Sequence, residues 1–234
     1  MKHSIQTIAL TLLISLISVS TLHAAVLYVP SEYPTIQAGI DSAVSGDTVL
    51  VADGTYSGQG NYAIDFMGKA ITLVSENGSD SCVIDCDWNG MGFNFHSSED
   101  TSSVVQGFTI THGSGFKGGG IVCVASSPFI VDCVLTENYS QIRGAGIYCD
   151  NGSAPEITRC DLSDNRVSSI CGRGGGLHAS NNCNPVMTDC TISNNTLAGN
   201  GSNGGGVSCV SNSTVTLVNC RITGNSVIGP GGGV

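Results

Sequence analysis

The sequence predicts an all-β protein: a right-handed parallel β-helix, a solenoid with a short capping α-helix at its N-terminal end. Three observations predict this fold. A unit of 26 to 30 residues recurs along the second half of the chain, apolar residues alternate in runs of three to five, and 32 glycines accompany only 11% charged residues. Short alternating runs indicate strands rather than helices, and self-similarity at this period indicates stacked repeats.

The repeat is clearest after residue 118. Each unit opens with a Gly-x-Gly before an aliphatic residue, and units begin at Gly118, Gly144, Gly174 and Gly204, with a fifth opening at Gly231. Each full unit later carries a Cys followed five residues on by an Asn, in the pairs Cys133 and Asn138, Cys160 and Asn165, Cys190 and Asn195, and Cys220 and Asn225. An earlier unit from Gly107 places Phe108 in the Cys position and Gly113 in the Asn position.

A unit this short cannot bury its own apolar face, so it must stack on a copy of itself. Stacking pairs each strand with its equivalents above and below, at about 4.8 Å. Equivalent residues then form ladders, and we expect hydrogen-bonded Asn side chains at one turn. Glycine in Gly-x-Gly allows positive φ and close backbone approach where the coil bends. The main alternative is a leucine-rich horseshoe, but its leucine spacing and helical segment are missing.

The first 58 residues divide into two predicted parts. Residues 1–24 have the plan of a secretory signal, with a positive start, an apolar run over residues 8–19 and a small, polar exit that predicts cleavage near Ala24. The alternative, a permanent membrane anchor, is disfavoured because a bilayer span needs roughly 20 apolar residues. Residues 25–58 are predicted to form the N-terminal cap and first coil. Residues 59–234 are predicted to form β-helix coils, truncated at the C-terminal end because the sequence stops in the opening of a new coil.

The cap is predicted to contain one helix, over residues 34–44. Apolar residues recur at helical spacing, with Pro34 near the start and Gly46 just past the end; these are Ile36, Ile40, Ala43 and Val44. The end of a solenoid exposes core and strand edges, which invite aggregation. We therefore expect this helix to cover the first coil.

Two stretches carry a resemblance to known proteins. Residues 29–58, VPSEYPTIQAGIDSAVSGDTVLVADGTYSG, look like the opening of pectin-lyase-like right-handed β-helix proteins, including pectinesterases. The later GFTIT, GGGI-x-C and NC-x-I-x-x-N units resemble the β-helix repeats of large bacterial secreted and surface proteins, and of polymorphic outer membrane proteins. The resemblance implies the fold and the superfamily over nearly all of residues 29–234. It implies little about activity, because one fold hosts many functions.

The sequence offers few residues for catalysis. The resemblance implies that polysaccharide-cleaving relatives work with carboxylates, calcium-bound Asp clusters and basic residues on one face of the coils. The best local carboxylates are Asp85 and Asp87, which would share a strand face, but ordinary turn chemistry explains them better. Pectinesterase motifs are not recognisable after Gly58, and neither is the Asp-Asp and His-Gly arrangement typical of polygalacturonases. We therefore predict no catalytic residue.

The remaining charged residues are interpreted as structural. His96, His112 and His178 are isolated from one another, so each is predicted to be a surface or turn residue, and His112 has no carboxylate pair nearby. No metal or cofactor is predicted, because acidic residues near the Asn positions do not recur at one phase; these are Glu137, Asp161 and Asp164. Basic residues of two coils could touch an acidic glycan, but we favour solvated edge residues that discourage edge pairing; these are Arg143, Arg159, Arg166 and Arg173.

Eleven cysteines, an odd count, leave at least one thiol free or paired elsewhere. The repeated Cys should form a ladder whose Cβ atoms, about 4.8 Å apart, lie slightly beyond the usual disulfide spacing of roughly 3.5–4.5 Å. We therefore favour a buried thiol stack. A second series consists of Cys123, Cys149 and Cys209, with Ala179 in the missing position. Cys171 and Cys183 fall outside both series and are the expected surface disulfide.

The predicted function follows from the repeat and the charge. A net charge of −10 argues against nucleic acid or anionic lipid as a partner. No segment after the signal is apolar for long enough to span a membrane. We expect an exported, non-catalytic protein, secreted or at the cell surface, structural, adhesin-like or glycan-binding. The alternative is a carbohydrate-active enzyme, a lyase, esterase or hydrolase of acidic polysaccharide. The regular repeat disfavours it, since active sites usually break a pattern.

Overall fold

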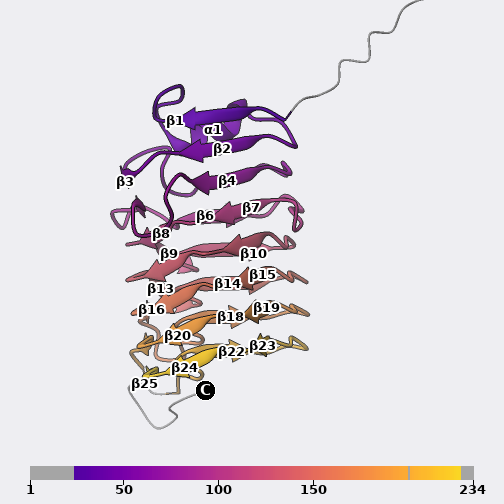
Figure 1. Ribbon diagram of the computed structural model, residues 1–234. Helices are drawn as coiled ribbons and strands as arrows, with labels where there is room; N and C mark the ends of the chain where they lie inside the picture. The colour runs from indigo at the N-terminus through magenta and orange to yellow at the C-terminus, as the bar shows by residue number, and fades with distance from the viewer. Residues whose placement is uncertain (1–23, 200, 228–234) are drawn as a thin grey trace, which may run out of the picture.

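A computed structural model describes residues 24–199 and 201–227, which form a stack of parallel strands closed at the N-terminal end by one short helix (Figure 1). Each strand pairs in parallel with the equivalent strand of the neighbouring coil, as in the pairs of Leu135 with Ile110 and of Leu135 with Leu162. The described residues contain no strand pair of any other kind. The predicted parallel β-helix is therefore confirmed.

The strands form four sheets that run along the axis. Sheet 1 contains β1 (Val26–Val29), β2 (Thr48–Val51), β4 (Thr72–Ser75), β7 (Val104–Gln106), β11 (Phe129–Val131), β15 (Glu156–Thr158), β19 (Val186–Thr188) and β23 (Thr216–Val218). Sheet 2 contains β3 (Gly54–Tyr56), β5 (Cys82–Asp85), β8 (Thr109–Thr111), β12 (Val134–Thr136), β16 (Asp161–Ser163), β20 (Thr191–Ser193) and β24 (Arg221–Thr223). Sheet 3 contains β6 (Phe93–Phe95), β10 (Ile121–Val124), β14 (Ile147–Asp150), β18 (Leu177–Ala179) and β22 (Val207–Cys209). Sheet 4 contains β9 (Ser114–Lys117), β13 (Tyr139–Arg143), β17 (Arg166–Val167), β21 (Thr196–Leu197) and β25 (Ser226–Val227).

The core is a set of aliphatic columns inside the coils. In sheet 1 the inward residue of each strand lies over its equivalent, and the column of five that runs from β4 to β19 is completely buried: Leu73, Val105, Ile130, Ile157 and Met187. Burying one such side chain contributes about 1.5–3 kcal/mol. Because successive side chains of a strand alternate between faces, the residues on either side of each core position point outward, where a site could form.

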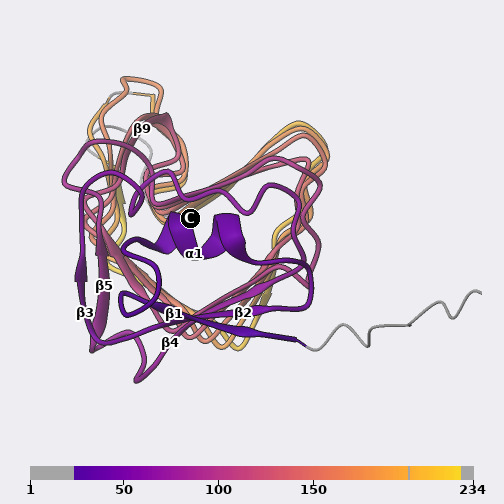
Figure 2. The same cartoon turned by 90° about the horizontal axis from the view of Figure 1, so that it is seen from above.

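The helix α1 (Ile36–Ser42) covers the first coil, as predicted, and lies across the open end of the stack (Figure 2). It is shorter than the predicted 34–44, because the backbone is already extended at Ala43. The Thr35 hydroxyl caps the helix by accepting a hydrogen bond from the backbone N–H of Ala38 at 3.2 Å. Ile36 and Ile40 are buried. A Cβ on Gly39 would lie 3.0 Å from the side chains of Val29 and Val49, so the helix packs closely on β1 and β2.

The Gly-x-Gly segments behave as predicted. The first glycine has positive φ in every full unit, with values of 74°, 61°, 59° and 66° at Gly118, Gly144, Gly174 and Gly204. The third glycine permits close approach, since a Cβ on Gly120 would lie 2.6 Å from the carbonyl oxygen of Gly146. A side chain at either position would strain the bend or push two coils apart.

The Asn ladder is also confirmed. The side-chain oxygen of Asn165 accepts from the backbone and side-chain nitrogens of Asn138, both at 3.0 Å. Its amide nitrogen donates to Asn195 Oδ1 and to the carbonyl of Leu135, both at 2.9 Å. Each Asn therefore joins its own coil to the coils on both sides.

The cysteine ladders have the predicted register. Cys133, Cys160 and Cys190 are buried, and the sulfur of Cys190 lies 3.5 Å from the backbone nitrogen of Cys160. In sheet 3, Cys123 pairs with Cys149, Cys149 with Ala179, and Ala179 with Cys209 in the register. All eleven cysteines are free thiols, which agrees with a thiol stack.

The predicted surface disulfide between Cys171 and Cys183 is wrong. Both residues are free thiols, and only Cys171 is exposed. Cys183 is completely buried as part of the core cluster, where it occupies an inward position after β18. Burial raises the pKa of its thiol, and a protonated thiol in the core behaves as a small apolar group.

The predictions at the two ends of the chain fall largely outside the described residues. The secretory signal of residues 1–24 falls on residues 1–23, and the unit that opens at Gly231 falls on residues 228–234. Within 24–199 and 201–227, no helix has the length and apolar character needed to cross a membrane.

Candidate functional site

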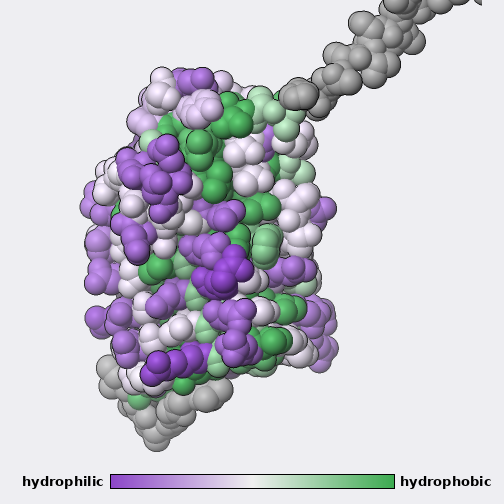
Figure 3. All heavy atoms as spheres, in the orientation of Figure 1, coloured by the Kyte–Doolittle hydropathy of each residue, from purple (hydrophilic) through white to green (hydrophobic). Residues whose placement is uncertain are grey.

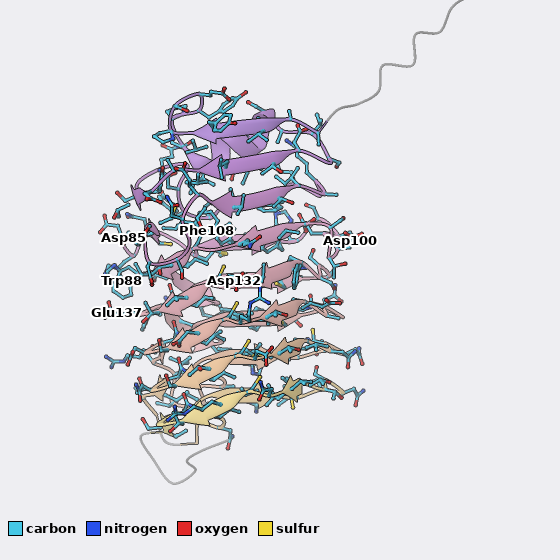
Figure 4. All side chains as sticks on the ribbon, viewed as in Figure 1. Asp85, Trp88, Asp100, Phe108, Asp132 and Glu137 are labelled. Carbon is cyan, nitrogen blue, oxygen red and sulfur yellow. The ribbon has the colours of Figure 1, made fainter. Side chains whose placement is uncertain are left out.

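The strongest cluster of chemical groups lies at the turn that joins sheet 2 to sheet 4, where His112 bridges two carboxylates. Its Nδ1 lies 2.9 Å from Asp85 Oδ1, and its Nε2 lies 3.1 Å from Glu137 Oε2. The three residues come from successive coils. Asp85 ends β5, whereas His112 and Glu137 each hold a positive-φ position just after a strand of sheet 2. Asp85 and Glu137 lie on one edge of the stack, opposite Asp100 (Figure 4).

The two carboxylates favour the charged form of the imidazole. Burial alone would lower the pKa of His112, but the hydrogen bonds and negative charges of Asp85 and Glu137 outweigh burial, so the pKa is raised. Burial would raise the pKa of Asp85, but the backbone N–H of Asp87 and the His112 ring outweigh it, so the pKa is lowered. His112 links three coils, and in its protonated form both ring nitrogens donate.

Trp88 borders a hollow beside this cluster. Its ring centroid lies 4.9 Å from that of His112, and 53% of the residue is exposed. The hollow, here called the ridge hollow, has a volume of about 290 Å³ and is lined by Trp88, Glu137, Asn138, Tyr139, Asp164 and Arg166. Hydrophilic side chains follow the edge of the stack on which Trp88 and Glu137 lie (Figures 3 and 4). The ridge hollow therefore combines an aromatic face, two carboxylates and a guanidinium.

A larger hollow, of about 490 Å³, opens at the last strands of the described stack. Its lining includes Val207, Val215 and Leu217, which belong to or adjoin the final strands of sheets 1 and 3. Most of its lining consists of apolar and small side chains of the last described coil, which offer few groups that could recognise a ligand.

Asp85 and Asp87 form a turn, as predicted, rather than a pair of catalytic carboxylates. The backbone N–H of Asp87 donates to Asp85 Oδ1 at 2.9 Å, and Asp87 has a φ of 47°. An Asp side chain that accepts from the backbone two residues on is an ordinary turn device. Asp85 shares His112 with a different carboxylate, that of Glu137, which lies 52 positions further along the sequence.

The three histidines differ from one another. His96 is a surface residue, as predicted, and its Nε2 lies 3.1 Å from Asp65. His112 is a turn residue, but the expectation that it has no carboxylate pair nearby is wrong, because the coils bring Asp85 and Glu137 to it. His178 is neither a surface nor a turn residue: it lies on β18 and is completely buried.

The arginines also occupy different environments. Arg159 forms two hydrogen bonds to Asp132, at 2.7 and 2.9 Å, on an exposed turn. Arg166 lines the ridge hollow. Arg143 and Arg173 lie side by side in a short parallel bridge at the edge of sheet 4. Arg159 and Arg166 are exposed, which agrees with the favoured interpretation of solvated residues, whereas Arg143 and Arg173 are half-buried.

The acidic residues near the Asn ladder are more regular than predicted. Glu137 and Asp164 do share a phase, since each has positive φ and directly precedes a residue of the Asn ladder. Asp161 lies elsewhere, on the outer face of β16. Among the described residues, no group of three or more His, Cys, Asp or Glu side chains is placed to hold a metal ion.

Sequence reasoning missed Trp88, Tyr139 and Glu137 as one group. A sequence signal for this group exists, and the strand register shows what it is. Val83, Ile84 and Asp85 pair with Thr109, Ile110 and Thr111, so the VIDCDW and TITHGS segments are equivalent coils. Extending the repeat one coil upstream would have placed Trp88 near His112 and the Asn turn.

Comparison with known proteins identifies the repeat. A family model described as "Right handed beta helix region" matches residues 72–234. No curated protein and no solved structure matches the chain. The match covers the coils of the ridge hollow, and it bears on the fold rather than on any activity.

Proposed function

Because this chain belongs to the right-handed β-helix family, we propose that it is an exported, non-catalytic member that binds a glycan at the cell surface. The observation that carries the proposal is the exposed Trp88 beside the ridge hollow. The C–H groups on one face of a sugar ring carry partial positive charge and pack on the negative face of an aromatic ring. Trp88 supplies such a face on a rigid, repetitive scaffold.

The polar side chains that line the ridge hollow are suited to binding the hydroxyl groups of a sugar. Sugar hydroxyls donate to carboxylates, which Glu137 and Asp164 supply, and accept from the guanidinium of Arg166. The lining residues come from coils stacked along the axis, because Tyr139 pairs with Arg166 in neighbouring strands. A chain polymer that runs along the stack could therefore contact several coils at once, and many weak contacts would add up.

The single tryptophan of the chain makes the proposal directly testable. The protein is titrated with polygalacturonate, alginate and a neutral glucan while Trp88 fluorescence and heat of binding are recorded. A saturable change in fluorescence with at least one glycan is expected.

Trp88→Ala and Arg166→Gln should each weaken binding about tenfold or more. Phe116→Ala, which removes another exposed aromatic ring, is the matched control and should bind like the wild type. Absence of any saturable change, or unaltered binding by Trp88→Ala, would refute glycan binding here.

Export is a separate part of the proposal and rests on residues 1–24. If the chain is exported and processed as expected, N-terminal sequencing of the protein recovered outside the cytoplasm should begin at Ala25. A chain that stays in the cytoplasm with residues 1–24 intact would contradict export without bearing on the ridge hollow.

An enzyme of acidic polysaccharide is the second candidate, and the Asp85–His112–Glu137 cluster favours it. Carboxylates joined through a histidine occur in catalytic sites, but here both ring nitrogens of His112 are occupied and its pKa is raised. A general base needs a free, neutral nitrogen near the operating pH. With both ring nitrogens bound to carboxylates, His112 fits a structural bridge between coils better than a base.

Turnover assays decide between the two candidates. The protein is incubated with pectin and alginate, with and without calcium, and new reducing ends and unsaturated products are measured. No turnover is expected. Cleavage that disappears in Asp85→Asn and in His112→Gln, but persists in His96→Gln, would establish the enzyme and overturn the non-catalytic assignment.

A further inference from the structure

A second site is indicated on another face, where positive charge gathers around a buried histidine. Lys117 pairs with Arg143 in neighbouring strands, and Arg143 forms a parallel bridge with Arg173. These residues form a column at the edge of sheet 4, with coils about 4.8 Å apart. Three of the eight Lys and Arg residues of the chain thus occupy one column of an acidic protein. Like charges in neighbouring rungs repel one another.

The Gly-x-Gly bend explains why this column lies beside His178. Residues 118, 144 and 174 directly follow the three cations, and all are glycines with positive φ. A Cβ on Gly174 would lie 2.9 Å from the Cβ of His178, so the bend folds onto the outer face of sheet 3. On that face Tyr148 pairs with His178, and their rings stack at 5.9 Å.

The polar atoms under the column lack protein partners. Both ring nitrogens of His178 and the Nε of Arg143 are buried without a hydrogen bond, and they make up three of the four such side-chain atoms among the described residues. Buried polar groups are otherwise almost always paired. Glu99, another buried ionisable residue, illustrates the contrast, since it accepts from Gly68, Ser97 and Ser126.

The nearby carboxylate is already engaged. Asp150 accepts from the Tyr148 hydroxyl at 2.6 Å and lies 3.9 Å from Lys117 Nζ. Among the described residues, no carboxylate lies within 4.0 Å of the basic nitrogens of Arg143 or Arg173. Arg143 and Arg173 are thus neighbours in the column, both half-buried and without an acidic partner, and the charges of both act on the His178 ring.

We propose that Arg143, Arg173 and His178 form an oxyanion-binding site, which takes the sulfate, phosphate or carboxylate group of a ligand. Arg is suited to this role because its planar N–H groups match an oxyanion in pairs. Burial, together with the charges of Arg143 and Arg173, lowers the pKa of His178 to about 3. His178 is then neutral, so it contributes one N–H donor without adding to the repulsion. The site involves different residues from the ridge hollow and does not depend on glycan binding there.

Binding is measured on the full chain with inorganic sulfate and inorganic phosphate as probes, by calorimetry and by the ring ¹⁵N shifts of His178. Saturable binding that moves the His178 shifts is expected. Arg143→Gln and Arg173→Gln should each weaken it about tenfold or more. Arg159→Gln removes the same charge from a paired, exposed arginine and is the matched control. His178→Phe keeps the aromatic stack while removing both nitrogens, and should also weaken binding.

Two results would overturn the site. One is the absence of saturable binding by either ion, with unmoved His178 shifts, which would leave water as the partner of the ring. The other is equal binding by Arg143→Gln, Arg173→Gln and the Arg159→Gln control. Competition with a polyuronate then identifies the source of the oxyanion. Displacement of sulfate assigns the site to a pendant group of a glycan, whereas no displacement assigns it to a free ion, and both results support the site. Trp88→Ala should leave sulfate binding unchanged.

Discussion

At the scale of single residues, Asn165 uses its whole side chain to join three coils. Its replacement by Ala would leave buried partners unpaired, among them the backbone N–H of Asn138 and the carbonyl of Leu135. Because a buried unpaired group costs about 1–3 kcal/mol, we expect Asn165→Ala to lower the free energy of unfolding by about 3 kcal/mol or more. Urea unfolding measures this loss. Asn184→Ala is the control, since Asn184 is exposed, and should change stability by less than about 0.5 kcal/mol.

Thiol reactivity should follow burial. Burial, with a smaller contribution from a neighbouring carboxylate, raises the pKa of Cys82 and of Cys86 to about 12, and only the thiolate attacks an alkylating reagent. In the native protein, iodoacetamide should modify the exposed Cys171 quickly and Cys82 or Cys86 only after unfolding. Mass spectrometry of peptides from native and urea-treated protein measures the alkylation of each cysteine. Cys171→Ser, which lacks the exposed thiol, is the control.

The thiol stack also predicts that its cysteines are not joined by disulfides. Peptide mapping under non-reducing conditions should recover Cys133 and Cys160 as separate thiols. A bridge between them would show that the ladder closes into disulfides instead of packing as small apolar groups.

The free energy of unfolding should depend on pH through the protonation of His112. Its folded pKa is raised, so its contribution is complete below the unfolded value of about 6.5 and is lost as pH rises through the folded value. The pKa of Asp85 is lowered, so its contribution is present above the unfolded value of about 3.9 and is lost as pH falls through the folded value. The cluster should therefore stabilise most between about pH 4 and pH 6.5.

We accordingly expect the difference in stability between wild type and His112→Gln to be largest at about pH 5.5 and to shrink as the pH rises above about 6.5, with a maximum of about 1 kcal/mol after solvent screening. Urea unfolding across this range provides the test. A difference that stays constant with pH would show that the ring acts by packing alone.

At the scale of elements, the helix α1 is stabilised by what it buries. Ile40 is completely buried against the first coil, whereas Val44, just past the helix, is 51% exposed. Ile40→Ala should lower stability by about 3 kcal/mol, since it leaves a cavity, while Val44→Ala should change it by less than about 0.5 kcal/mol. Thr35→Ala, which removes the N-cap hydroxyl, should cost about 1 kcal/mol. Thermal and urea unfolding of the three variants rank these effects, and equal losses for Ile40→Ala and Val44→Ala would refute the role of α1 as a cover.

The turns, rather than the strands, create both candidate sites. At the turn after sheet 2, the residue before each ladder Asn, or before Gly113 in its place, takes positive φ, and its identity differs from coil to coil: His112, Glu137, Asp164 and Asn194. The bend before sheet 3 places Lys117, Arg143 and Arg173 in a second variable column. Strand interiors keep the stack together, and turn columns are where a β-helix can acquire chemistry.

At the scale of the whole molecule, stability should differ between the strands of the stack and the turns that project from it. The strands β12 and β16 are paired with neighbouring coils on both sides, whereas Ser57, Gly58 and Gln59 form an exposed turn. In hydrogen exchange, the backbone N–H groups of β12 and β16 should be protected nearly as well as global unfolding allows, and those of residues 57–59 should exchange through local opening. Mass spectrometry of peptic peptides resolves these segments. Equal protection of β12 and of this turn would mean that the stack opens only as one unit.

The sequence by itself determined the β-helix, the capping helix, the Asn ladder and the register of both cysteine ladders. These features repeat, and a repeat that cannot bury its apolar face alone has essentially one way to stack. The tertiary structure decided what does not repeat. Only stacking brought His112 between Asp85 and Glu137, put Trp88 beside the ridge hollow and buried His178 under two arginines. The physical reason is that each cluster joins residues from successive coils, about one repeat apart in sequence but about one strand spacing apart in space.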